Sequence, residues 1–335
     1  MLWSTLMGVF DWLLRDVYGG WMTLLADLLG VEMLSYGYMQ RAFLAVVLIG
    51  IACPLVGSFL VHRNLSMIGD TLAHTAFAGV AVGLFVNSLL SLSLSPMLTA
   101  LVVAVGAALL VETLIDRTDA RGDASLAVVL TGGFALGSVL ITATDGGLSV
   151  GINAYLFGSL STVSAGNVGF LVGICAIVCA VVAVAYRPLV FVTFDPTAAR
   201  ASRIPVGLYN RLLVVLTAMV VVSAMRIMGV ILVAALLVIP VLTASGAARS
   251  FASSILLGMV AAIVAGTVGV ALAYQFGLAA GGSIVLSAIG LYALVLGVEH
   301  VSTSFGSADS ADIREATGAV DVGDDEGATT DRDPQ

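Results

Sequence analysis

The chain has 335 residues, of which 60% are hydrophobic and only 10% are charged, and its formal net charge is −8. Average soluble domains carry about 25% charged residues, and a soluble fold of this length could not bury so much apolar surface. Because lipid removes the need for a polar exterior, the composition indicates an integral protein of the cell membrane.

The negative charge is concentrated at the C-terminal end. Residues 1–300 contain 12 acids and 11 arginines, a net charge of −1, whereas residues 301–335 contain 9 acids and 2 arginines, a net charge of −7. Low hydrophobicity with high net charge is typical of disordered segments. We therefore expect residues 301–335 to form an acidic, solvated tail.

Every basic residue is an arginine, and lysine is absent. A Walker A loop needs a lysine that reaches the nucleotide phosphates, so we expect no ATP hydrolysis by this chain through such a loop. The absence of lysine and the excess of acids suit an organism with high internal salt, but GC-rich coding would also replace lysine by arginine.

Residues 1–41 combine Trp, Leu and Met with a few charged residues. This mixture is typical of helices that lie on a membrane surface, so we expect an N-terminal interfacial segment. One additional membrane span in this stretch is an open alternative, because its charges are few.

Nine apolar segments follow, and most approach the roughly 20 residues that a helix needs to cross the hydrocarbon core. They are 42–62, 70–90, 97–115, 125–143, 168–186, 209–228, 229–247, 251–275 and 283–299. The sequence therefore predicts an all-α polytopic membrane protein with about nine transmembrane helices (8–10). The transmembrane domain should occupy residues 42–300.

The arginines indicate the orientation of these helices. Basic connections alternate with connections that lack arginine, and basic connections are preferentially cytoplasmic. The basic connections lie near Arg63, Arg117, 187–211 and Arg249. This orientation places the acidic tail in the cytoplasm and residues 1–41 outside. Arg226 departs from the pattern, because it lies between two adjoining apolar segments.

The polar connection 187–211 contains a predicted short cytoplasmic helix. Asp195 followed by Pro196 is a favourable helix start, with Asp as N-cap and Pro at the first position. Pro205 can end the helix. The sequence thus predicts a helix outside the bilayer within 195–204.

Ionisable residues within membrane segments are costly and indicate functional sites. Asp70 and His74 are four residues apart, so both side chains lie on one helix face. A carboxylate and an imidazole can together bind a divalent transition metal ion. The alternative is structural: Asp70 caps the helix and His74 donates a hydrogen bond within the bundle. Glu112 lies at a segment end, and we expect it at the membrane interface.

Several segments in chain order resemble the zinc/manganese ABC permease family, typified by the permease of the bacterial high-affinity zinc uptake system. The resemblance covers about residues 42–298. It is carried by residues 54–83 (PLVGSFLVHRNLSMIGDTLAHTAFAGVAVG), 153–158 (NAYLFG), 194–210, 229–244 (GVILVAALLVIPVLTA) and 281–286 (GGSIVL).

The resemblance implies a homodimeric permease in the lipid bilayer that works with two separate ATPase subunits and an extracellular metal-binding protein. It implies no nucleic-acid partner. Asp70 and His74 match the family's polar pair, which implies contact with the transported zinc or manganese ion; no permanently bound cofactor is implied. The family usually has Gly at the position of Arg203. The residues implied in docking on the ATPase are Asp195, Ala198, Ala199, Arg200 and Arg203.

The predicted function is therefore that of the non-enzymatic permease subunit of an ABC importer for zinc, manganese or iron. Two alternatives stay open from the sequence alone. One is an ABC permease for a metal chelate such as a siderophore or cobalamin. The other is an ion-coupled secondary transporter, which would need further coupling carboxylates in the bundle.

Overall fold

The computed structural model describes residues 16, 18–90, 94–117, 122–143, 155–158 and 163–318. All regular structure among these residues is helical, which confirms the predicted all-α class. The physical reason is that hydrocarbon offers no partners to backbone amides and carbonyls, so each spanning segment forms its hydrogen bonds internally. Eight of the described helices are long and apolar enough to cross a membrane, and one further apolar helix is shorter.

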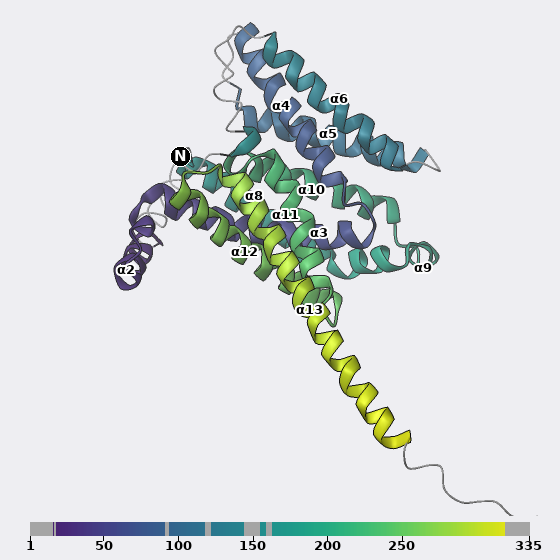
Figure 1. The fold of residues 1–335 in the computed structure, drawn as a ribbon. Helices are drawn as coiled ribbons and strands as arrows, with labels where there is room; N and C mark the ends of the chain where they lie inside the picture. Colours follow the sequence, from purple (N-terminus) through teal and green to yellow (C-terminus); the bar gives the residue numbers. More distant parts are fainter. Residues whose placement is uncertain are drawn as a thin grey trace, which may run out of the picture. The chain divides into compact units, whose positions relative to one another are not determined.

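Figure 1 labels the helices along the chain. Their bounds are α2 Gly19–Leu29, the 3-10 helix η2 Glu32–Ser35, α3 Gly37–His62, α4 Ile68–Leu90, α5 Pro96–Arg117, α6 Gly122–Thr142, α8 Ala165–Phe194, α9 Pro196–Ala201, α10 Val206–Met228, α11 Val230–Ser245, α12 Phe251–Phe276 and α13 Ala280–Gly318. The chain divides into two compact units, residues 1–292 and residues 293–335.

The segments predicted at 168–186 and 229–247 differ in length from the helices observed. The segment predicted at 168–186 is α8, which has 30 residues and continues to Phe194. The segment predicted at 229–247 is α11, which has only 16 residues. At 1.5 Å per residue α11 is about 24 Å long, which is less than the roughly 30 Å thickness of the hydrocarbon core.

The helices near the two ends of the chain have bounds that differ from the predicted domain boundaries. Within residues 1–41 the structure contains α2 and η2, and α3 already begins at Gly37. At the other end α13 continues to Gly318, so residues 301–318 are helical where no regular structure is expected. Extending an existing helix avoids the cost of nucleation. Residues 1–15 and 319–335 lie outside the described residues.

The first unit is built around α3 and α10, the two most deeply buried of the long helices. α10 contacts α3, α4, α5 and α8, while α3 also contacts α8, α11 and α12. α4 lies between α5 and α6 and packs closely against both, and Figure 1 shows these three helices side by side. Through α10, the region around α9 is therefore connected to α4.

Gly229 interrupts the helical backbone between α10 and α11. The φ angle of Gly229 is 87°, a conformation that L side chains rarely adopt. A Cβ atom there would also overlap the backbone of residues 156–158. Arg226, the exception to the arginine pattern, lies just before this break, with its guanidinium 5.9 Å from the ring centre of Tyr155. A cation–π contact of this kind accounts for the position of Arg226.

Gly57 permits the close approach of α3 and α11, and its replacement should destabilise the protein. A Cβ atom at Gly57 would overlap the carbonyl group of Leu237. We expect Gly57→Ala to cost about 1–3 kcal/mol, because the two backbones must separate. The measurement is the thermal unfolding midpoint in detergent. Gly173→Ala is the matched control, because a Cβ atom at Gly173 meets nothing within 4 Å; equal midpoints for the two variants would contradict the close approach.

Candidate functional site

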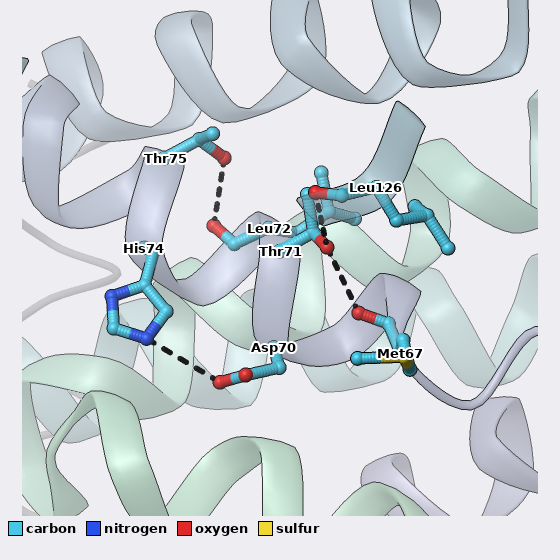
Figure 2. A network of polar contacts seen from close by, with 7 residues as sticks. All are labelled: Met67, Asp70, Thr71, Leu72, His74, Thr75 and Leu126. Carbon is cyan, nitrogen blue, oxygen red and sulfur yellow. Dashed lines mark hydrogen bonds and ion pairs between the residues drawn. The ribbon is translucent and has the colours of Figure 1, made fainter. Parts of the chain in front are cut away.

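Asp70 and His74 lie in the first two turns of α4, which begins at Ile68. The Nε2 atom of His74 is 3.5 Å from the Oδ1 atom of Asp70. Figure 2 shows the two side chains directed toward each other from the same side of the helix. The predicted common face is therefore present, and an imidazole and a carboxylate lie side by side on it.

The surroundings of Asp70 do not support the capping alternative. Within the described part of the chain, no backbone N–H group donates to the Asp70 carboxylate, and its recorded polar contact is with His74. Its side chain is 44% exposed. Its negative charge still interacts favourably with the N-terminal end of the α4 dipole. Asp70 is thus held near the helix start with its oxygens largely available to another partner.

The second ring nitrogen of His74, Nδ1, is buried and makes no hydrogen bond within the described residues. A buried nitrogen without a partner costs roughly 1–3 kcal/mol, so a purely structural histidine would be a poor choice at this position. The imidazole ring packs edge-on against Phe134 of α6, with the ring centroids 5.4 Å apart.

The hydroxyl groups near the pair are engaged by the backbone. Thr71 Oγ1 donates to the carbonyl of Met67 at 3.0 Å and lies 3.4 Å from that of Leu126. Thr75 Oγ1 donates to the carbonyl of Leu72 at 3.0 Å (Figure 2). The hydroxyl groups of Thr71 and Thr75 are thus satisfied by backbone carbonyls.

The pair supplies two donors of the kind that bind divalent transition metals. Imidazole suits ions such as zinc, whereas carboxylate is also a good ligand for manganese. The described residues contain no group of three or more His, Cys, Asp or Glu side chains that could hold a metal ion. Asp70 and His74 by themselves supply two ligand groups.

The second candidate region is α9, and its start agrees with the sequence prediction. Oδ1 of Asp195 accepts hydrogen bonds from the backbone N–H groups of Thr197 at 3.1 Å and Ala198 at 2.8 Å. Pro196 occupies the first helical turn. The Asp-Pro pair thus starts a helix of six residues between α8 and α10.

The five residues implied in docking do not all share one environment. Asp195, Arg200 and Arg203 are exposed and Ala198 is partly buried. Ala199 is fully buried and belongs to a small cluster with Val192 and Val206. Ala199 therefore anchors α9 to the body of the protein and does not itself face a partner.

The backbone of Arg203 explains why glycine is suited to this position. Its φ angle is 61°, in the left-handed region where most L residues are strained. Glycine adopts this conformation without a steric penalty. Arginine adopts the same turn here and adds a positive charge to the exposed end of α9.

Comparisons with known proteins agree with this arrangement. The ABC 3 transport family matches residues 35–299 of the chain. The manganese transport system membrane protein MntC of Halalkalibacterium halodurans is 32% identical over 263 residues, covering 78% of this chain and 88% of that protein. A protein of Haemophilus influenzae named "Probable iron transport system membrane protein" is 25% identical and covers 88% of this chain and 99% of its own length.

Among solved structures, the chain is similar to PsaBC from Streptococcus pneumoniae in complex with Fab. The TM-score is 0.71 and the identity 29%, over 81% of this chain and 95% of that one. A second similar structure, described as "An inward-facing conformation of a putative metal-chelate type ABC transporter", has a TM-score of 0.64 at 17% identity over 77% of this chain and 85% of that one. That identity indicates a shared fold alone, so it does not support the metal-chelate alternative.

The geometry predicts that Asp70→Asn and His74→Leu are tolerated by the fold. Asparagine keeps the size of Asp70, whose carboxylate makes no capping bond, so we expect a change within about 0.5 kcal/mol. Leucine removes the buried nitrogen without a partner, which offsets the lost contact between Nε2 and Asp70, so we expect a similarly small change. The measurement is the thermal unfolding midpoint of each purified variant. A loss above about 1 kcal/mol in either variant would favour the structural alternative.

Proposed function

Because the chain belongs to the ABC 3 transport family, we propose that it forms the translocation pathway of an importer for zinc or manganese, with iron as a further possible cargo. The chain is a transport subunit of the membrane and not an enzyme, which agrees with the absence of lysine for a Walker A loop. ATP is hydrolysed on separate ATPase subunits. A binding protein outside the cell delivers the metal ion.

The observation that carries this proposal is the pairing of Asp70 and His74. Nε2 of His74 lies 3.5 Å from Oδ1 of Asp70. Nδ1 of His74 is buried and lacks a hydrogen-bond partner among the described residues. Ionisable groups in a membrane helix generally face a bundle interior or a water-filled pathway. A passing divalent ion would satisfy both groups at once, and it is the cargo, not a resident cofactor.

A second copy of the chain would complete this site. Asp70 is 44% exposed, and the neighbouring Phe134 is also 44% exposed. A carboxylate facing lipid would be costly, so this face of α4 and α6 is suited to an interface along the pathway. Two copies related by a two-fold axis would bring two carboxylates and two imidazoles together, which is enough for four protein ligands.

The ATPase subunit would dock on the exposed side of α9. Asp195, Arg200 and Arg203 are exposed there and form a polar surface. The arginine pattern assigns this end of the protein to the cytoplasm. On its buried side, Ala199 packs α9 against Val192 of α8 and Val206 of α10. Movement of α9 with the ATPase would therefore be passed to α8 and α10.

Metal uptake tests the role of Asp70 and His74. We expect Asp70→Asn and His74→Leu each to lower the uptake of manganese or zinc at least tenfold in proteoliposomes that contain the ATPase and the binding protein. Because both residues hold one ion, the double variant should be little worse than either single variant. Asp27→Asn, which changes an exposed carboxylate of α2, is the matched control. Uptake near the wild-type rate by Asp70→Asn would remove the carboxylate from the site.

Charge reversal on α9 tests the docking surface. We expect Arg200→Glu and Arg203→Glu to reduce co-purification of the ATPase at least tenfold while membrane insertion stays normal, because both side chains are exposed. Arg249→Glu is the matched control, an exposed arginine between α11 and α12. Cross-linking that places residues 195–204 outside the cell would show that the topology and the docking surface are both wrong.

A further inference from the structure

Arg63 joins three helices at the end of the bundle that carries α9. It is the C-cap residue of α3. Its Nε donates to Thr193 Oγ1 of α8 at 2.9 Å, and its Nη1 donates to Asn210 Oδ1 of α10 at 2.7 Å. A third bond, from Nη2 to the carbonyl of Leu189, is 3.4 Å long. Burial lowers the pKa of Arg63 to about 10, so the group remains a cation at neutral pH.

Glu112 makes a second link to the start of α10. Its Oε2 accepts a hydrogen bond from Nε of Arg211 at 3.0 Å. The side chain of Glu112 is only 6% exposed, and its Oε1 is buried without a hydrogen-bond partner among the described residues. Glu112 is therefore buried within the protein, where Arg211 of α10 reaches it, and its expected depth at the membrane interface stays a prediction.

A cavity of about 420 Å³ lies beside these two links. Its wall includes Arg63, Glu112 and Asn210, together with Pro196 and Arg200 of α9 and Ile68 at the start of α4. A cavity of this size with charged and polar groups in its wall can hold water, which can replace a direct hydrogen bond during a movement. The hydrogen bonds of Arg63 and Glu112 can therefore lengthen or shorten without a rearrangement of tightly packed side chains.

α9 and the first turns of α10 form one body. Four residues separate the two helices, and the backbone N–H of Ile204 donates to the carbonyl of Ala199 at 3.0 Å. Ala199 packs against Val206, the first residue of α10. A displacement of α9 must therefore carry Asn210 and Arg211 with it, since both lie within the first two turns of α10.

We propose that Arg63 and Glu112 are positioning residues that pass the movement of α9 to the metal-binding helix α4. Arg63 acts on the connection that precedes α4, five residues before Ile68. Glu112 acts on α5, which packs along α4. The inference rests on the proposed docking of the ATPase on α9. Charge-assisted hydrogen bonds are suited to this role, because they are strong and directional.

Proteoliposomes with the ATPase and the binding protein test this inference through the number of metal ions imported per ATP hydrolysed. For Arg63→Met and Glu112→Gln we expect this ratio to fall at least tenfold, while ATPase co-purification and at least half of the ATP hydrolysis remain. Asn210→Asp keeps an acceptor for Arg63 and should retain the wild-type ratio, whereas Asn210→Leu should lose it. Arg249→Met is the control for removal of an exposed charge.

A purely structural role predicts a different result. Uptake and ATP hydrolysis would then fall together with the amount of assembled protein, and the ratio would stay constant, which would overturn the inference. If the variants at Arg63 or Glu112 fail to insert, the import ratios of Asn210→Asp, Asn210→Leu and Arg211→Met provide the test. Arg211→Met is suitable because the Arg211 side chain is 56% exposed and its replacement should not prevent folding. A wild-type ratio in Asn210→Leu and Arg211→Met would also overturn it.

The same assay separates this inference from the proposed function. A wild-type complex whose ATP hydrolysis drives no metal uptake would contradict the proposed function itself. A wild-type complex that couples the two activities, with variants that couple them equally well, would contradict only the role of Arg63 and Glu112.

Discussion

Hydrocarbon leaves the backbone groups of a membrane protein with no partners except one another, and this constraint determines the rest of the structure. It imposes helices throughout the described residues. It also makes each polar side chain within the bundle costly unless another group satisfies it. The few ionisable residues that remain there, such as Asp70, His74 and Glu112, consequently identify the parts of the bundle where something other than packing is required.

Hydropathy predicts where the helices lie because the requirement for about 20 apolar residues acts on each segment separately. The start of α9 is likewise local, since the carboxylate of Asp195 and the ring of Pro196 act on adjacent backbone groups. The boundary between α10 and α11 is also indicated, because the apolar segments 209–228 and 229–247 adjoin there. The close approach of residues 156–158 to Gly229 is different, because it is a contact between distant segments and leaves no periodic signal in the sequence.

The same distinction holds for the candidate site. The common face of Asp70 and His74 follows from a spacing of four residues and could be predicted. The lack of a partner for Nδ1 of His74 could not, because it depends on how α6 brings Phe134 against the ring. The burial of Glu112 could not be predicted either. Its partner, Arg211, comes from a helix about 100 residues further along the chain, and no pattern around Glu112 indicates that contact.

An importer must hold its ion long enough to select it and weakly enough to release it. A closed cage of ligands within one chain would retain a transition metal tightly, as structural sites do. In the proposed dimer, two donors on one chain completed by two on a second copy would avoid this problem, because any movement that separates the copies would remove half of the ligands at once. In that arrangement the position of α4 sets the affinity for the ion. The proposed mechanical connection from α9 to α4 would then allow ATP hydrolysis to set the direction of transport.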